Sequence, residues 1–228
     1  YEYSIGGALL TRRYDGLAKG SPTSVMMGVD GCINDLADGE NVIHGLGFSE
    51  YSGENNGYTY SLRRYMARGY AAEIFDLQIT DVSGDGKTAD VMFSALSGIS
   101  APTEVYRSGD RICVVRKADG KGFAIMASAP ISDCAFYREG YYAYGGVDRA
   151  TDFRKGGSET APALSCRIDL APFGVARVVF ALAHIGEESE LESINEEIAD
   201  AFFTAEVELF TATGIYPDTH NDILDNLY

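Results

Sequence analysis

The densest group of side chains that can bind a ligand lies between Phe136 and Arg154. Aromatic rings can stack on the C–H face of a sugar or on a protein surface, and charged groups can hydrogen-bond hydroxyls. The candidate contact residues are Tyr137, Arg138, Tyr141, Tyr142, Tyr144, Asp148, Arg149, Asp152 and Arg154. Core packing, carbohydrate contact and subunit contact all stay open for these tyrosines. Their imperfect alternation predicts that at least one of them, Tyr142, faces away from the core.

Catalytic groups are harder to find. Acidic residues are abundant, so a carboxylate pair such as Glu50 and Glu54 can be drawn, but nothing in the pattern positions the two for glycoside hydrolysis. No serine lies in a Gly-x-Ser-x-Gly context, which argues against acyl transfer. The sequence therefore predicts no catalytic residue in this chain.

Metal and cofactor motifs are equally weak. Residues 81–86 imitate the start of a calcium loop, but Met92 stands where such a loop needs glutamate, so a turn is predicted there. No Cys-x-x-Cys pair is present, and four separated cysteines with three histidines do not form a zinc motif. We expect neither a metal nor a cofactor, and structural roles for His44 and His184.

Composition limits the partners. The chain has 228 residues, 46% of them hydrophobic, and a net charge of −16, which argues against nucleic-acid and anionic-membrane partners. No apolar run approaches the roughly 18 residues of a membrane helix. Cys113 and Cys166 lie in apolar strand patterns, which predicts buried thiols and favours a reducing compartment, so we expect a cytoplasmic protein.

Period-two patterns dominate most of the chain. Residues 73–80 alternate, residues 82–87 form a turn signal and residues 89–96 are apolar, which together predict a long antiparallel hairpin. The glycine-rich residues 45–57 are predicted to be a surface loop. Further strands are predicted at residues 24–29, 103–107, 111–117, 122–128, 163–170 and 175–183. The predicted fold class is mainly β, a large antiparallel β-sandwich (super-sandwich) spanning residues 1–186, followed by a C-terminal linker helix.

After residue 187 the apolar period becomes helical. Residues at three- and four-residue steps from Leu191 to Leu209 are apolar, and glutamates fill the opposite side. This predicts one long helix between about Glu188 and Phe210, with Ser189 as a possible cap. Residues 187–228 are interpreted as a helical linker that leads towards a further, catalytic domain.

The order of these parts resembles the N-terminal β-sandwich and helical linker of cellobiose-phosphorylase-type glycoside phosphorylases and related (α/α)6-barrel enzymes. Residues 11–17 are also similar to a segment of glycogen-debranching-type N-terminal domains, with Asp15 where that family has histidine. The matching pieces are strand and turn patterns at residues 57–60, 73–81, 148–153, 161–164, 168–172, 178–182 and 216–219. In that family the catalytic acid belongs to the barrel, so the resemblance implies a non-catalytic module.

Two functions follow as hypotheses. The chain is either the N-terminal module of a glycoside phosphorylase or hydrolase, supporting its barrel or a homodimer, or a free-standing carbohydrate-binding or protein-interaction module. Its expected partners are an oligosaccharide, a downstream catalytic domain or a second copy of the chain.

Overall fold

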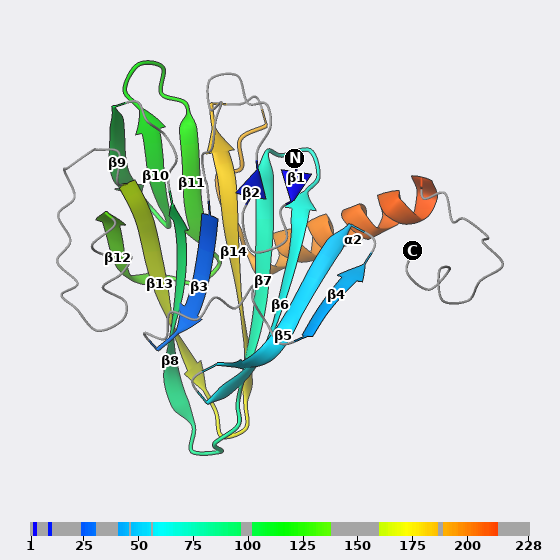
Figure 1. Ribbon diagram of the computed structural model, residues 1–228. Helices are drawn as coiled ribbons and strands as arrows, with labels where there is room; N and C mark the ends of the chain where they lie inside the picture. Colours follow the sequence, from blue (N-terminus) through cyan, green and yellow to red (C-terminus); the bar gives the residue numbers. More distant parts are fainter. Residues whose placement is uncertain are drawn as a thin grey trace.

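The computed structural model describes residues 2–3, 9–10, 24–30, 41–45, 47–55, 57–96, 102–137, 160–186 and 189–213. These residues form mainly antiparallel strands and one helix, as predicted (Figure 1). The elements are β1 (Glu2–Tyr3), β2 (Leu9–Leu10), β3 (Ser24–Val29), β4 (Asn41–Gly45), β5 (Phe48–Asn55), β6 (Tyr58–Ala67), β7 (Ala72–Asp81), β8 (Lys87–Leu96), β9 (Thr103–Ser108), β10 (Arg111–Arg116), β11 (Gly122–Ala127), β12 (Ile131–Tyr137), β13 (Thr160–Leu170), β14 (Val175–Ile185) and α2 (Glu196–Thr213).

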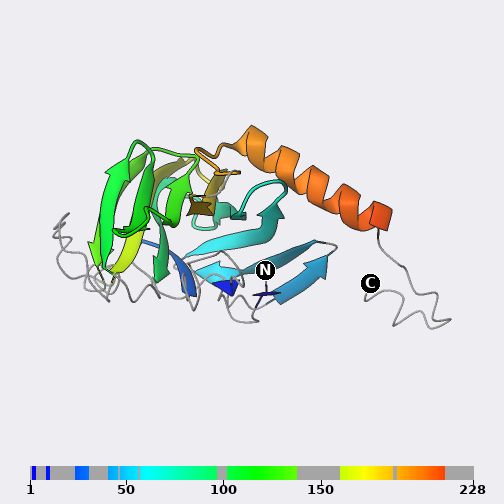
Figure 2. The same cartoon turned by 90° about the horizontal axis from the view of Figure 1, so that it is seen from above.

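Three layers make up the fold. An eight-stranded sheet has the order β4-β5-β6-β7-β14-β11-β10-β9, and a four-stranded sheet has the order β12-β13-β8-β3. The short strands β1 and β2 pair with each other. Helix α2 lies on the face of the large sheet that points away from the small sheet (Figure 2). The large sheet is therefore the central layer, with an inner face towards the small sheet and an outer face towards the helix.

The inner core fills the space between the two sheets. On β6, Tyr58, Tyr60 and Leu62 point into it, while the residues between them point outwards, as strand alternation requires. Phe93 of the small sheet stacks on Phe180 of the large sheet, with ring centroids 5.1 Å apart. These contacts join the sheets into one sandwich.

A second core lies between the large sheet and α2. Tyr65, Ile74, Val179 and Ala181 line the sheet side, and Ala199 of the helix is fully buried against them. β11 and much of β14 are consequently buried on both faces. This explains why their sequences are continuously apolar rather than alternating.

The predicted hairpin of residues 73–96 is wrong. β7 pairs with β6 and β14 in the large sheet, whereas β8 pairs with β13 and β3 in the small sheet. The turn between them crosses from one sheet to the other, and Gly84 and Gly86 adopt positive φ angles there. A turn signal indicates a change of direction but does not say which strand becomes the partner.

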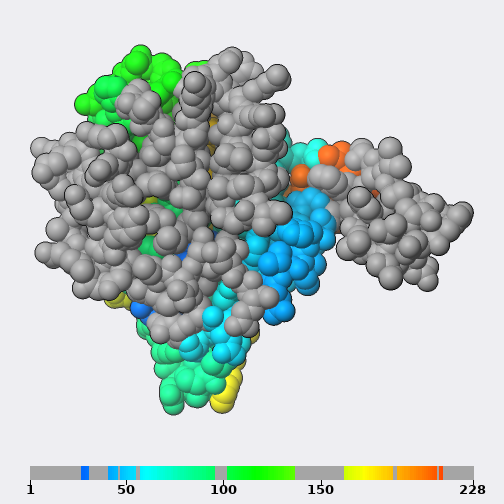
Figure 3. All heavy atoms as spheres, in the orientation of Figure 1, coloured from blue at the N-terminus to red at the C-terminus, as the bar shows by residue number. Residues whose placement is uncertain are grey.

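A second crossing turn, residues 171–174, joins β13 to β14 beside the first one. The amide of Asp81 donates to the carbonyl of Gly174 at 3.1 Å. A Cβ at Gly84 would overlap the ring of Phe173, which is 70% exposed and has a φ of 53°. In Figure 3 the two turns form one tip of the molecule.

The prediction of a surface loop at residues 45–57 is also wrong. Residues Phe48–Asn55 form β5, which pairs with β4 on one side and β6 on the other. Gly47 and Gly57 have φ angles near 80° and belong to the turns at its two ends. Tyr51 points into the inner core and is 8% exposed. The glycines thus mark tight turns around a polar strand.

The helix begins later than predicted. α2 starts at Glu196 and ends at Thr213, and Asn195 Oδ1 caps it by accepting a hydrogen bond from the Ile198 amide at 2.8 Å. Leu191 and Ile194 were part of the helical pattern but precede the helix, where both are buried against the outer face of the sheet. Apolar spacing cannot separate a docked extended segment from the first turns of a helix.

Three cysteines, Cys113, Cys134 and Cys166, are free and buried, as expected for the two that the sequence singled out. Burial raises the pKa of each thiol, to about 12 for Cys166. In the part of the chain that the structure describes, no helix has the length and apolarity to cross a membrane. The cytoplasmic location stays a prediction.

Candidate functional site

Of the predicted contact residues, Tyr137 lies in the edge strand of the small sheet. It is the last residue of β12 and pairs with Thr160, the first residue of β13. Apart from Tyr137, the predicted contact residues, Arg138, Tyr141, Tyr142, Tyr144, Asp148, Arg149, Asp152 and Arg154, lie outside the described residues. Their roles stay predictions.

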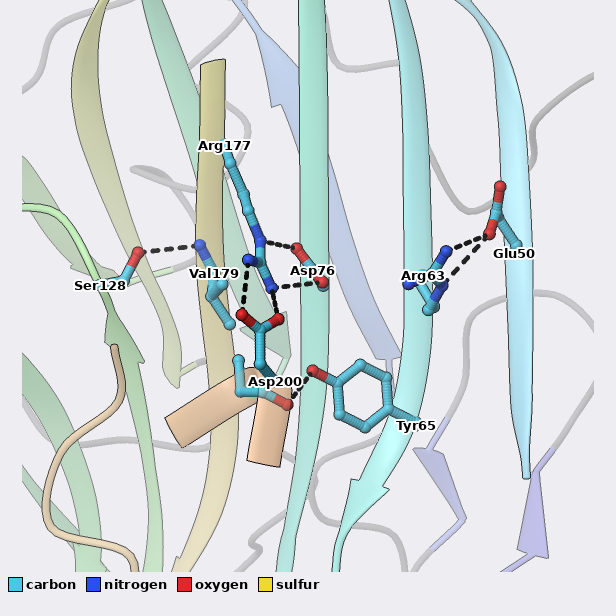
Figure 4. Close-up of polar contacts among 9 residues, drawn as sticks. Glu50, Arg63, Tyr65, Asp76, Ser128, Arg177, Val179 and Asp200 are labelled. Carbon is cyan, nitrogen blue, oxygen red and sulfur yellow. Dashed lines mark hydrogen bonds and ion pairs between the residues drawn. The ribbon is translucent and has the colours of Figure 1, made fainter. Parts of the chain in front are cut away.

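The most extensive polar cluster among the described residues joins the large sheet to α2. Arg177 of β14 donates to both oxygens of Asp76 on β7, at 2.8 and 2.9 Å (Figure 4). The same guanidinium also donates to both oxygens of Asp200 on α2, at 2.7 and 3.3 Å. The two carboxylates raise the pKa of Arg177, and hydrogen bonds from Arg177 lower the pKa of Asp200. We call these three residues the helix clamp.

Aromatic contacts fix the helix beside the clamp. The hydroxyl of Tyr65 donates to the carbonyl of Ala199 at 2.9 Å, and its ring packs edge-on against Phe203. Arg63 lies over the Phe203 ring at 4.4 Å from the centroid and is held by Glu50 of β5 at 3.0 Å. The direction of α2 is therefore set by contacts with β5, β6, β7 and β14.

A second arginine, Arg64, points to the opposite face of β6. Its Nε and Nη2 donate to Oε1 of Glu73 at 3.1 and 2.8 Å, and the side chains are only 3% and 0% exposed. Oε2 of Glu73 has no hydrogen-bond partner among the described residues. Burial raises the pKa of Glu73, and the guanidinium of Arg64 opposes that rise.

These charged residues were not singled out from the sequence. A signal for them exists, because Asp76 interrupts the apolar run of β7 and Arg177 interrupts that of β14. A lone charge in an apolar strand indicates a partner from another element. Neighbouring Arg63 and Arg64 could not be told apart without knowing which face of β6 is covered.

Glu50 and Glu54, the pair that the sequence offered, do not have the spacing of a glycosidase pair. Glu50 and Glu54 are four residues apart on β5, or about 13 Å, whereas catalytic carboxylates are about 5 to 9.5 Å apart. Glu50 is engaged by Arg63 and by the Ser61 hydroxyl, and Asp76 by Arg177. Glu73 has the raised pKa that a general acid needs, but it is fully buried.

The motif that resembles a calcium loop is a turn anchor. Asp81 accepts hydrogen bonds from the Ser83 amide and hydroxyl and from the Gly86 amide, and the Ser83 hydroxyl lowers its pKa. Within the described part of the chain, no three acidic, histidine or cysteine side chains are placed to hold a metal ion. His184 is buried in the inner core, which lowers its pKa to about 4, and His44 on β4 contacts Ser49 at 3.0 Å.

The fold is similar to part of a bacterial glucoamylase solved as a complex with acarbose. The TM-score is 0.57 at 10% sequence identity, over 83% of this chain and 31% of the glucoamylase chain. A putative kojibiose phosphorylase from the human microbiome matches with a TM-score of 0.39 at 7% identity, over 79% of this chain and 22% of that chain. A polysaccharide lyase matches with a TM-score of 0.38 at 10% identity, over 61% of this chain and 22% of that chain. No protein-family model and no curated protein sequence matches the chain.

At 10% identity, the likeness to glucoamylase concerns the architecture alone. The chain spans less than a third of that enzyme's length. The described residues share a β-rich architecture with the matched part of the glucoamylase.

Proposed function

We propose that the chain is the non-catalytic N-terminal β-sandwich module of a carbohydrate-active enzyme of the glycoside phosphorylase or hydrolase type. Residues 1–186 form the sandwich, and residues 187–228 form a helical linker that leads to an (α/α)6 catalytic barrel. The single observation that carries the proposal is the shared architecture with glucoamylase, which covers most of this chain but under a third of the enzyme.

The position of α2 supports a role as a linker. The helix is held by the helix clamp and by Tyr65 and Phe203, and it continues past the β4 edge of the large sheet in both ribbon views (Figures 1 and 2). A helix fixed at its base and extended at its end transmits the orientation of the sandwich to whatever follows it. A barrel joined there would be held in a defined position.

The engagement of carboxylates by arginine supports a non-catalytic role. Glycoside hydrolysis needs one carboxylic acid that can protonate the leaving group and one free carboxylate. Glu50, Asp76 and Glu206 are paired with Arg63, Arg177 and Arg68. A carboxylate held by a guanidinium is not free to act on a glycosidic bond, which suits an architectural role.

Turnover is the direct test. The purified chain is incubated with maltose, kojibiose and cellobiose, with and without inorganic phosphate, and we expect no release of glucose or glucose 1-phosphate. Sustained turnover that persists after repurification would contradict the proposal. The reading frame beyond residue 228 should encode a helical barrel, and a stop codon there would favour the free-standing module instead.

A further inference from the structure

The structure has a cleft whose lining includes none of the three residues of the helix clamp. It has a volume of about 330 Å³ and is formed where the β9–β10 turn, the end of β11 and the segment before α2 meet. Ligand pockets start at about 300 Å³, so the cleft has room for one small ring rather than a long chain.

Two of the residues that line the cleft are apolar core residues, Met126 of β11 and Ile194 of the segment before α2, and they are only 1% and 5% exposed. Both belong to the core between the large sheet and α2. They fix the position of the cleft but offer a ligand little apolar surface.

The walls carry hydrogen-bonding groups from two separate segments. Asp110 and Arg111 come from the β9–β10 turn, and Glu192 and Ser193 come from the segment before α2. Asp110 and Glu192 are exposed, so their carboxylates can accept hydrogen bonds from a ligand. Arg111 adds a donor that is held at the wall, because its Nη1 contacts Glu190 Oε1 at 3.3 Å.

Contacts outside the cleft hold these walls in place. Arg107 Nε donates to the carbonyl of Gly109 at 3.0 Å, which closes the β9–β10 turn. Glu190 accepts from the Gly186 amide at 3.3 Å as well as from Arg111, which ties the segment before α2 to both strands. The hydroxyl of Ser128 accepts from the Val179 amide at 2.9 Å (Figure 4), so its own proton points away from that amide.

We propose that this cleft binds one pyranose unit of a neutral oligosaccharide. Carboxylate, guanidinium and hydroxyl groups line a cleft of this size, and they match the hydroxyls at the edge of a sugar ring. The two carboxylates and the net charge of −16 disfavour an anionic ligand. The proposal rests on the proposed function, since it gives the carbohydrate-active module a second contact with the substrate chain.

The test is a titration of the isotope-labelled 228-residue chain with maltotriose and with cellotriose, followed by two-dimensional NMR. The site is open and has no aromatic platform, so we expect a Kd of roughly 1 mM for the matching sugar. Asp110→Asn and Glu192→Gln should each weaken binding about 10-fold, which corresponds to about 1.4 kcal/mol. Ser193→Trp should fill the cleft and abolish binding.

The matched control is Glu104→Gln, the same chemical change at an exposed position of β9 that does not line the cleft. It should bind like the parent chain, and all four variants should keep the parent melting temperature. Failure of both sugars to shift the cleft resonances at about 20 mM would overturn the proposal. Equal sugar binding in all variants would show that the sugar does not bind in this cleft, and it would leave the proposed function intact. Turnover of disaccharides would instead overturn the proposed function alone.

Discussion

Replacing Arg64 by methionine should destabilise the chain strongly, because it leaves the carboxylate of Glu73 buried without its cation. Nε and Nη2 of Arg64 both donate to Glu73, whose side chain is 0% exposed. Removing one partner of such a pair costs about 3 to 5 kcal/mol. Arg63→Met is the internal control, since its partner Glu50 is 25% exposed, and losing that ion pair and the stacking on Phe203 should cost about 1 to 2 kcal/mol.

The loss in Arg64→Met should also depend on pH. Burial already raises the pKa of Glu73, and without Arg64 the rise is larger. When the folded pKa exceeds the unfolded one, the native state binds more protons, so the free energy of unfolding falls as pH rises through that window. The deficit should be smaller at pH 5 than at pH 8. Glu73→Gln lacks the titrating group, so its own free energy of unfolding should not contain this pH-dependent contribution.

Urea unfolding followed by circular dichroism measures these differences. A loss of about 4 kcal/mol moves the midpoint by roughly 2 M urea for a slope near 2 kcal/mol/M. The double variant Arg64→Met with Glu73→Leu should recover most of the loss, because no buried charge remains. A loss below about 1 kcal/mol in Arg64→Met, or an equal loss in the double variant, would refute the reasoning.

Three further predictions use the same measurements. Arg177→Met should lower the free energy of unfolding by about 3 kcal/mol, because it leaves the nearly buried carboxylate of Asp76 without its cation. Asp200→Asn should cost under about 1 kcal/mol, because Asp200 is exposed. Equal losses in the two variants would contradict the assigned roles. The pKa of His184 is about 4 in the folded chain, below its ordinary value, so stability should fall as pH drops from 6.5 towards 4. His184→Gln should reduce this dependence of stability on pH. If the dependence is unchanged in the variant, other titrating groups cause it. Tyr142→Ala should weaken association with a glucan, a partner domain or a second copy while the melting temperature stays within about 4 °C; a loss of about 3 kcal/mol or more would instead place Tyr142 in the core.

Much of the strand content was predictable from the sequence. The meander of β9, β10 and β11 was predicted to within one residue at each end, because its short strands pair with their sequence neighbours. Tight turns between adjacent partners leave a local signal. The hydrophobic alternation of residues 73–80 likewise predicted a strand there, which is β7.

Pairing between distant strands left no such signal. β7 lies beside β14 and β8 lies beside β13, so both partners come from the far half of the chain. Apolar patterns show that each strand is buried but not which sheet contains it. The helix clamp was missed for the same reason, since Asp76, Arg177 and Asp200 come from three elements that only the completed fold brings together.

The crossing turns at the tip set the order in which the chain can fold during synthesis. Val175 of β14 pairs with Thr80 of β7 but follows it by 95 residues. β7 therefore leaves the ribosome long before β14, its neighbour in the sheet, has been synthesised. At roughly 5–20 residues/s the wait is about 5 to 20 s. During this time β6 and β7 present an open strand edge, and β8 waits likewise for β13. Newly made chains are therefore exposed to edge-to-edge aggregation until β14 inserts, which makes chaperone dependence and low yield at high expression rates expected properties of this topology.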